Sequence, residues 1–156
     1  MNRIVYRNMT SDDVEEVAEI EKNTFPMPWS KQSFYKEINE NNMAKYIVAV
    51  KGNEIVGYGG LWHIITKMNI TNIAVKKEYR GLGIGKGLVS SLIDIAKNDE
   101  LVEGISLEVR RSNFTAQDLY RKYGFYVIGI RGKYYEDNRE DAYIMHKKIE
   151  RVKGHI

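Results

Sequence analysis

One stretch in the middle of the chain constrains the fold and the chemistry more than any other. An apolar segment at residues 72–75 leads through a basic turn into a loop with glycines at positions 81, 83, 85 and 87, and apolar residues then recur at helical spacing. Glycine has no Cβ, so a glycine-rich backbone can approach a ligand closely. The first turn of the following helix adds unpaired N–H groups and the positive end of the helix dipole. The stretch therefore predicts a phosphate or pyrophosphate site between a strand and a helix.

Two common phosphate-binding loops do not fit this stretch. The loop of P-loop nucleotide hydrolases requires G-x-x-x-x-G-K-S/T, but Gly85-Lys86 is followed by another glycine and is preceded by Arg80 where the first glycine belongs. The dinucleotide fingerprint G-x-G-x-x-G fails in both registers, because its last position falls on Lys86 or on Leu88. The spacing that does fit is Arg-x-x-Gly-x-Gly, formed by Arg80, Gly83 and Gly85.

Length and composition limit what the rest of the chain can be. Its 156 residues are 43% hydrophobic and 29% charged, which is typical of one globular domain. We expect that domain to span residues 1–149 and the charged tail at residues 150–156 to fray. No run of 18 apolar residues occurs, so we expect no membrane span. The N-terminal residues enter a strand-like pattern instead of a signal peptide, and cysteine is absent, so we expect a cytoplasmic protein.

The composition also argues against several kinds of site. Without cysteine there is no disulfide, no cysteine nucleophile and no thiolate metal site. His63, His146 and His155 lie far apart without metal-ligand spacing, so we expect no metal. A net charge of +3 suits an anionic cofactor, but it is too small to indicate a dedicated nucleic-acid-binding protein. The sequence gives no indication of the oligomeric state.

Hydrophobic periodicity predicts an α/β (α+β) domain with the order β-α-α-β-β-β-α-β-α-β-β. The expected strands lie at residues 3–9, 46–50, 55–65, 68–75, 105–109, 125–130 and 142–148. Antiparallel hairpins come first, and a parallel strand–helix–strand unit centred on the glycine loop follows. We therefore expect a mixed, mostly antiparallel sheet with helices on both faces.

The expected helices carry recognisable end signals. Thr10 and Asp13 have capping-box spacing, Ser30 and Asn113 can each cap a later helix, and Gly124 can end the last one in the left-handed conformation. The apolar stripe of the first helix runs through Val14, Val17, Ala18 and Glu21.

The two prolines of the chain stand together in the segment Phe25-Pro26-Met27-Pro28-Trp29. Two prolines around one residue stiffen this segment and exclude helix there. It is either a plain connection between two helices anchored by Trp29 or a rigid wall of a substrate groove, and the residues alone favour neither.

The Arg-x-x-Gly-x-Gly spacing resembles the acetyl-CoA loop of the GNAT superfamily of N-acetyltransferases. The resemblance extends along the whole chain, and it is greatest to the bacterial ribosomal-protein-alanine N-acetyltransferases of that superfamily. The matching segments, in the family's order, are Phe25-Pro26-x-Pro28-Trp29-Ser30, Gly57-Tyr58-x-Gly60-Leu61-Trp62, Ile70 to Val75, Glu78-Tyr79-Arg80-Gly81, Leu107-Glu108-Val109-Arg110-x-Ser112-Asn113, Ala116-x-x-Leu119-Tyr120, Tyr123-Gly124-Phe125 and Tyr134-Tyr135-x-Asp137-Asn138-x-Glu140-Asp141-Ala142.

The resemblance implies acetyl-CoA as the cofactor. Loop amides would hold its pyrophosphate, and the preceding strand would pair with the pantetheine arm and aim a backbone N–H at the thioester oxygen as an oxyanion donor. The residues implied are Ile73, Ala74, Val75, Arg80, Gly81, Gly83, Ile84, Gly85, Lys86 and Asn113. Lys76, Lys77 and Lys86 would add positive charge near the phosphates or remain ordinary surface charges. Asn113 would bond the pantetheine, cap its helix, or do both.

Acetyl transfer to an amine requires a neutral amine, a stabilised oxyanion and a protonated leaving thiolate. Without cysteine, direct attack in a ternary complex is the simplest scheme. An α-amine has a pKa of ~7.7–8.0, against ~10.4 for lysine, so a protein N-terminus needs only a modest base. The resemblance implies that base to be Glu108, acting directly or through water. From the residues alone, the favoured interpretation of Glu108 is a solvated strand carboxylate beside Arg110 that faces away from Leu107 and Val109.

The resemblance likewise implies Tyr120 as the general acid. A phenol with a pKa of ~10 can protonate a thiolate whose acid form has a pKa of ~8.5 only with help from position and polarity. From the helical pattern alone, Tyr120 is equally a core aromatic beside Leu119 and Tyr123.

One stretch departs from the family pattern. Family members of this type commonly carry an acidic pair and a histidine before the central strand, where this chain has Thr66-Lys67-Met68-Asn69. An acidic lip would attract a basic N-terminal peptide, so its loss bears on the acceptor. Negative charge from the last loop, at Glu136, Asp137, Glu140 and Asp141, is an alternative source.

The sequence therefore predicts an acetyl-CoA-dependent N-terminal protein acetyltransferase, acting on the alanine of a small-subunit ribosomal protein. The expected peptide-binding residues are Phe25, Pro28, Trp29, Tyr134 and Tyr135. Two rivals remain, an acetyltransferase for small amines and an acyl-CoA-binding sensor without turnover. The aromatic loops favour a narrow peptide slot over an open amine pocket, and the presence of Glu108 and Tyr120 argues against the sensor.

Overall fold

A computed structural model describes residues 3–150, so most of the tail at residues 150–156 lies outside the described residues. The predicted order of elements is confirmed. The strands are β1 (Ile4–Asn8), β2 (Ala44–Lys51), β3 (Glu54–Ile64), β4 (Lys67–Val75), β5 (Gly104–Arg110), β6 (Tyr126–Arg131) and β7 (Ala142–Lys148), and the α-helices are α1 (Val14–Thr24), α2 (Lys31–Glu40), α3 (Ile84–Lys97) and α4 (Phe114–Lys122). Short 3-10 turns precede α1 at Ser11–Asp13 and follow β4 at Lys77–Tyr79. None of the helices within residues 3–150 is long and apolar enough to span a membrane.

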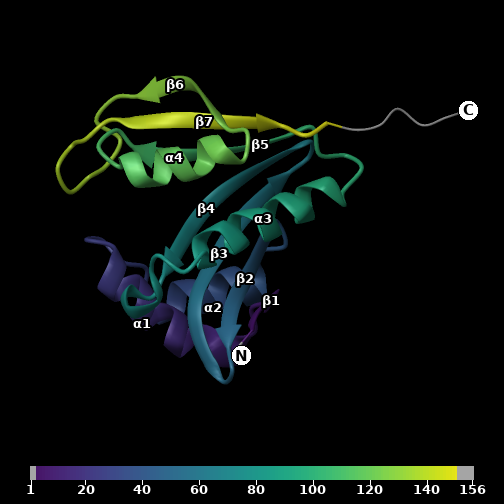
Figure 1. The fold of residues 1–156 in the computed structure, drawn as a ribbon, viewed down its shortest axis with the longest axis vertical. Coiled ribbons are helices and arrows are strands. Elements are labelled where there is room, and N and C mark those ends of the chain that lie inside the picture. The colour runs from purple at the N-terminus through teal and green to yellow at the C-terminus, as the bar shows by residue number, and fades with distance from the viewer. Residues whose placement is uncertain (1–2, 151–156) are drawn as a thin grey trace, which may run out of the picture.

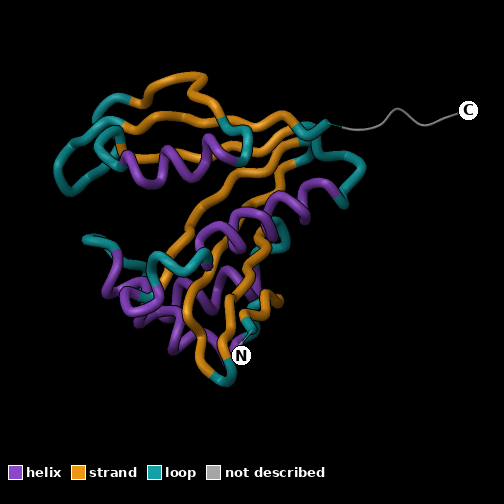
Figure 2. Tube along the Cα trace, viewed as in Figure 1, coloured by secondary structure: helices purple, strands orange, loops and turns teal. Residues whose placement is uncertain are grey.

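The seven strands form one sheet in the order β1-β2-β3-β4-β5-β7-β6. All neighbouring pairs are antiparallel except β4 and β5, which run parallel over four residue pairs, from Lys67 with Gly104 to Ile70 with Leu107. This parallel pair is the one predicted around the glycine loop, since α3 makes the crossover between its strands. Beyond Ile70 the two strands separate, and Figure 1 and Figure 2 show them diverging from their shared end.

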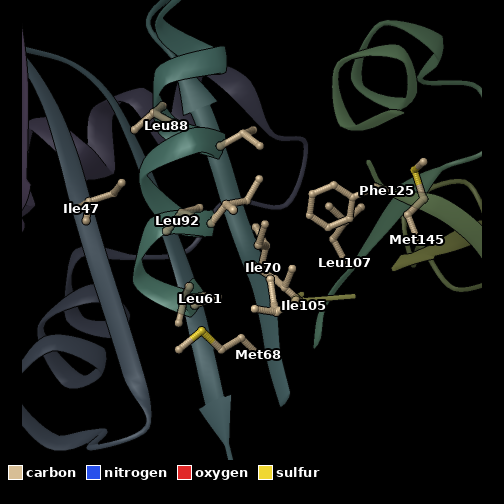
Figure 3. Packing of buried hydrophobic residues seen from close by; sticks show 14 of the residues in the cluster. Ile47, Leu61, Met68, Ile70, Leu88, Leu92, Ile105, Leu107, Phe125 and Met145 are labelled. Atoms are coloured by element: carbon tan, nitrogen blue, oxygen red, sulfur yellow. The ribbon is translucent and has the colours of Figure 1, made fainter. Parts of the chain in front are cut away.

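Helices cover both faces of the sheet (Figure 1). On one face α3 packs against β2, β3 and β4, and its buried residues Leu88 and Leu92 meet Leu61, Ile70 and side chains of β5 in the larger core (Figure 3). On the other face α1 and α2 enclose a second core around Phe34 and Tyr58. Both cores reach β4, so the central strand receives packing from both layers.

A β-bulge in β4 separates these two environments along one strand. In the pairing with β3, Gly60 lies opposite Asn72 but Leu61 lies opposite Ile70, so Thr71 is an extra residue. An extra residue shifts the alternation of side chains by one. Ile70 accordingly packs in the core under α3, whereas Ala74 packs in the core under α1 and α2. The bulge lies where β4 leaves β5, so it coincides with the opening between the strands.

The predicted end signals act as expected. Thr10 and Asp13 form a complete capping box, and the buried Asp13 carboxylate also pairs with Arg7. The side chains of Ser30 and Asn113 accept the backbone N–H groups of Ser33 and Ala116. Gly124 follows α4 with a φ of 94°.

Candidate active site

A cleft of about 670 Å³ lies where β4 and β5 diverge. Its walls come from both strands, from α1 and the segment after it, from α4, and from the loop between β6 and β7. The lining residues are Glu21, Phe25, Pro26, Met27, Trp29, Ile70, Thr71, Asn72, Ile73, Leu107, Glu108, Val109, Arg110, Asn113, Ala116, Tyr120, Tyr134, Tyr135, Glu136 and Asp137. The cleft thus brings together residues that are more than a hundred positions apart in the sequence.

The glycine loop is shaped for the approach of a ligand to its backbone. Gly81 and Gly83 have φ values of 81° and 85°, a region that L side chains rarely adopt, and Gly83 is the N-cap of α3. A Cβ built on either glycine meets no heavy atom of the described residues within 4 Å, so open space lies beside both. Gly87 differs, because a Cβ there would lie 1.9 Å from the Tyr6 hydroxyl oxygen. A side chain at position 87 would displace the Tyr6 ring, whereas the glycines at positions 81 and 83 keep the loop accessible.

The edge of β4 that faces the cleft offers backbone groups as well. The N–H of Lys76 donates to the Val56 carbonyl on β3. Because N–H groups alternate between the two edges of a strand, those of Ile73 and Val75 are directed to the opposite edge, which β5 has left. Ala74, predicted with them as a cofactor contact, has its backbone turned toward β3 and its side chain only 4% exposed. Of the three strand residues, Ile73 and Val75 thus direct their backbone N–H groups to the edge that β5 does not cover.

The basic residues near the loop have distinct environments. The Arg80 Nε donates to the Val75 carbonyl at 3.0 Å, which ties the loop entrance to the end of β4. Lys86 and Lys77 are exposed. Lys76 pairs with Glu54 at 2.6 Å, and this hydrogen bond raises the Lys76 pKa. The ion pair joins β3 to the end of β4.

Two of the predicted cofactor residues have limited means of contact. Ile84 is the first residue of α3, and its side chain is buried against the sheet with 2% exposure, so only its backbone can face a ligand. The Asn113 side chain accepts the Ala116 N–H at 3.1 Å and thus caps α4, although Asn113 also lines the cleft.

Glu108 projects from β5 to the face opposite α3, as the alternation of the strand predicts. Its neighbours Leu107 and Val109 are buried, while its own side chain is 16% exposed. Asn69 of β4 approaches both carboxylate oxygens through Nδ2 at 3.4 and 3.5 Å, and the Arg131 Nε of β6 lies 3.9 Å from Oε1. Asn69 belongs to the stretch that departs from the family pattern, so this departure directly contacts the candidate base.

Tyr120 reaches the cleft from α4 and packs edge-on against Phe125, with ring centroids 5.8 Å apart. Burial raises its pKa to about 12, and the neighbouring Tyr135 adds to the shift. The phenol therefore keeps its proton throughout the neutral range, as an acid in this position must.

Four aromatic residues besides Tyr120 line the cleft. Phe25 and Trp29 line it from the segment after α1, and Tyr134 and Tyr135 line it from the loop between β6 and β7. Trp29 also packs against Phe34, with ring centroids 5.4 Å apart. Trp29 is therefore an anchor of the second core and a wall of the cleft at the same time. Pro28, predicted to bind peptide, is not among the lining residues, whereas Pro26 and Met27 are.

Arg110 holds the loop at residues 132–141 in place. It pairs with Asp137 at 3.0 Å and with Glu140 at 3.3 Å, and its guanidinium lies 3.9 Å from the centre of the Tyr135 ring. Arg111 pairs with Asp141 at 3.4 Å. Three of the four acidic residues that the sequence offered as a peptide-attracting lip are thus paired with arginines.

Sequence reasoning missed three of the cleft's functional candidates. Glu21 stands in the apolar stripe of α1 and Asn72 in an apolar strand, and both are buried, with 2% and 8% exposure. A polar residue at an otherwise apolar core position was the available signal for both. Arg110 was named only as a neighbour of Glu108, because its partners lie about 30 residues further along the chain.

The site combines two diverging parallel strands with a glycine loop at a helix N-terminus, and one cleft holds both a carboxylate and a phenol. This combination is typical of an enzyme that transfers a group from a phosphate-bearing cofactor. The chain belongs to the acetyltransferase (GNAT) family, because the model of that family matches residues 14–125. It is an acetyltransferase, and enzymes of this family use acetyl-CoA.

Named relatives agree with this assignment. A Bacillus subtilis (strain 168) protein called "Putative ribosomal protein bS18-alanine N-acetyltransferase" is 47% identical over 139 residues, covering 89% of this chain and 91% of the relative. An N-alpha-acetyltransferase of Saccharolobus solfataricus is 33% identical and covers 92% of each chain. The crystal structure of the ribosomal-protein-S18-alanine N-acetyltransferase from Escherichia coli superposes with a TM-score of 0.87 at 27% identity, covering 99% of both chains.

Proposed function

We propose that this chain acetylates the α-amino group of a protein N-terminus, with the alanine of a bS18-type small-subunit ribosomal protein as its acceptor. The observation that carries the proposal is the cleft itself, which holds Glu108 and Tyr120 between an exposed strand edge and an aromatic slot. The names of the Bacillus subtilis and Escherichia coli relatives support the choice of acceptor.

The residues present fit acetyl-CoA. Open space beside Gly81 and Gly83 suits a pyrophosphate against the loop amides, and the exposed Lys86 supplies positive charge. The free N–H groups of Ile73 and Val75 suit a pantetheine arm and an oxyanion. Acetyl-CoA supplies the acetyl group as a thioester, which an amine can attack directly.

Glu108 is the proposed base in this reaction. Its carboxylate accepts a proton from the acceptor ammonium, directly or through water. Asn69 of the adjacent strand β4 and Arg131 of β6, which lies beyond β7, approach the carboxylate and leave it partly exposed. An α-amine loses its proton near pH ~8, so a carboxylate in this position needs to supply little driving force.

Tyr120 is the proposed acid. Its hydroxyl donates a proton to the departing thiolate, and burial keeps that proton in place up to a pH of about 12. The raised pKa makes the phenol a weaker acid than free tyrosine, so its contribution depends on position more than on acidity.

The acceptor end of the cleft is the part lined by Phe25, Trp29, Tyr134 and Tyr135. The Arg110 side chain takes up the charges of Asp137 and Glu140 and stacks on Tyr135. The Tyr135 ring is therefore held in place before a peptide binds. Aromatic walls suit an extended peptide N-terminus better than a compact amine, and this lining is what favours the proposal over the small-amine rival.

Release of free CoA from acetyl-CoA tests the proposal. The purified chain is incubated with acetyl-CoA and peptides that begin with Ala, Ser, Met or Asp, with polyamines as a parallel series. We expect release with the Ala-initial peptide copied from the N-terminus of bS18, and little with polyamines. Release with polyamines alone would establish the small-amine rival, and tight CoA binding without any release would establish the sensor.

A further inference from the structure

A buried carboxylate lies beneath the acceptor end of the cleft. Glu21 of α1 is 2% exposed and accepts three hydrogen bonds, from the Tyr58 hydroxyl, from the Trp29 backbone N–H at 2.9 Å, and from the Asn72 Nδ2 at 3.5 Å. All three partners donate to the two oxygens of the Glu21 carboxylate. Burial, together with the nearby Glu21, raises the Tyr58 pKa, so the Tyr58 hydroxyl remains a donor.

Glu21 also determines which way the Asn72 amide points. Since Nδ2 is the donor end, its contact with the carboxylate directs Oδ1 to the other side. Asn72 is 8% exposed and lines the cleft, and its Oδ1 has no hydrogen-bond partner among residues 3–150. A buried acceptor without a partner is uncommon in folded proteins, and one that lines a cleft suits a donor brought by a ligand.

The bulge places the Asn72 side chain on one side of the cleft. Because Thr71 is an extra residue, Asn72 faces α1, on the opposite side of the sheet from α3 and on the side to which Glu108 projects. The aromatic walls Phe25 and Trp29 follow α1 on this same side. The edge of β4 proposed for the cofactor instead presents the backbone N–H groups of Ile73 and Val75.

We propose that Asn72 Oδ1 accepts a hydrogen bond from the first peptide unit of the acceptor, and that Glu21 is a positioning residue which keeps this oxygen directed at the peptide. The donor is either the α-amino group or the backbone N–H that follows it. This inference rests on the proposed function, since it assigns a specificity contact to the same cleft. Glu21 also binds the Trp29 N–H, so the carboxylate fixes the slot wall and the acceptor oxygen together.

Two variants test the orientation of the amide. In Glu21→Gln, an amide nitrogen replaces Oε1 and can donate to Asn72. The Asn72 amide then turns over, so that its Nδ2 faces the peptide in place of Oδ1. The remaining oxygen of the glutamine still accepts the Trp29 N–H. We expect KM for an Ala-initial peptide to rise about 3- to 10-fold, as for one lost hydrogen bond, with the Kd of acetyl-CoA unchanged. Asn72→Leu removes the oxygen and is expected to raise KM at least as much.

Glu37→Gln is the matched control. Glu37 of α2 also accepts from a tyrosine and a tryptophan, the Tyr46 hydroxyl and the Trp62 Nε1, but it does not line the cleft. Both glutamine variants alter a carboxylate that accepts from a tyrosine hydroxyl, buried at Glu21 and partly buried at Glu37, and only Glu21→Gln is expected to change the peptide KM. Equal KM rises in both would reduce Glu21 to a structural role and overturn the inference.

A peptide N-methylated at its second residue distinguishes the two donors. If that backbone N–H is the donor, methylation raises KM on the unmodified enzyme and has little effect on Asn72→Leu. If the α-amino group is the donor, methylation has little effect on either enzyme, while Asn72→Leu still raises KM. An unchanged peptide KM in both cleft variants, or a loss of acetyl-CoA affinity in place of a change in KM, would overturn the inference.

Calorimetric binding of the peptide to the CoA-bound enzyme separates this test from that of the proposed function. Absence of CoA release with every peptide would refute the function, yet weaker peptide binding to Glu21→Gln than to Glu37→Gln would still support the contact. If the unmodified enzyme neither releases CoA nor binds any peptide, both proposals fall.

Discussion

The two sides of the cleft are built from different material. The cofactor side consists of backbone: left-handed glycines at positions 81 and 83, the N-terminus of α3, and the free edge of β4. The acceptor side consists of side chains, among them Glu21, Glu108 and the stack of Arg110 on Tyr135, and they come from α1, β5 and the loop before β7.

This difference separates what can vary from what cannot. A backbone site depends on a short stretch of sequence and tolerates change in every side chain that points elsewhere. A side-chain site depends on residues that only the complete fold brings together, so a substitution in any of its elements alters it. We therefore expect variants on one side of the cleft to change acetyl-CoA binding alone, and variants on the other side to change the peptide KM or the chemical step.

The largest effect is expected for Glu108→Gln, which keeps the shape and removes the base. Loss of a positioned base lowers kcat by about 10²–10⁴-fold, and the Kd of acetyl-CoA should not change, because Glu108 lies on the acceptor side. Steady-state kinetics and equilibrium binding provide the two measurements. Glu103→Gln, an exposed glutamate just before β5, is the control. Wild-type kcat in Glu108→Gln would remove the residue from the mechanism.

Tyr120→Phe is expected to lower kcat by about 10²-fold, the low end for general acid catalysis, because a thiolate is an easy leaving group. Burial raises the pKa of Tyr120 to about 12, so its hydroxyl is protonated at every usable pH. The deficit relative to the unmodified enzyme should therefore be the same from pH 6 to pH 10. A deficit that disappears above pH 9 would contradict the acid role.

Gly83→Val tests the backbone side. A β-branched residue at a φ of 85° is strained, and we expect acetyl-CoA to bind about 10-fold more weakly, while the peptide KM at saturating acetyl-CoA stays unchanged. Gly52→Val is a matched control, because Gly52 also has a positive φ, 63°, and open space for a Cβ, but lies in the hairpin between β2 and β3. Equal losses of affinity in both variants would show that strain alone, and not the loop, is responsible.

Arg110→Lys tests the pinned loop at residues 132–141. Lysine keeps the charge but loses the guanidinium fork that reaches both Asp137 and Glu140, so the slot walls become mobile. We expect the peptide KM to rise about 3-fold, with acetyl-CoA affinity retained. Arg111→Lys, which alters the more exposed pair with Asp141, should have a smaller effect. A change in acetyl-CoA affinity would break the division between the two sides.

The smallest effect concerns pH. The hydrogen bond from Arg110 holds the Asp137 pKa below its ordinary value of 3.8. A lowered pKa stabilises the folded loop above the unfolded pKa, and this contribution is lost as the pH falls through the folded pKa. Amide hydrogen exchange should therefore show loss of protection at residues 132–141 below pH about 4, while helix α3 keeps its protection. Parallel losses in the loop and in α3 would indicate general unfolding.

The fold followed from local signals because most of them act within a few residues. The caps at Ser30 and Asn113, the turn at Gly124 and the order of strands were all predicted and are confirmed. The glycine loop could also be predicted from the sequence, because its conformation depends on its own residues.

The acceptor side was predicted less completely, for the opposite reason. In the sequence, Glu21 is one more position in the stripe of a helix. Its partners Tyr58 and Asn72 can be recognised only once α1 is known to pack on the sheet. From the sequence, Lys76 suited a phosphate ligand and a surface charge equally well, and its pairing with Glu54 follows only from the pairing of β3 with β4. In each case the missing information was which strand lies next to which helix or strand.

One inserted residue, Thr71, sets the phase of the central strand. Before it, the even-numbered side chains of β4 belong to the layer of α3, and after it they belong to the layer of α1. A strand in continuous phase would present Asn72 to the layer of α3. One inserted residue therefore lets a single strand fill the core under α3 with its first half and line the cleft with a polar side chain from its second half.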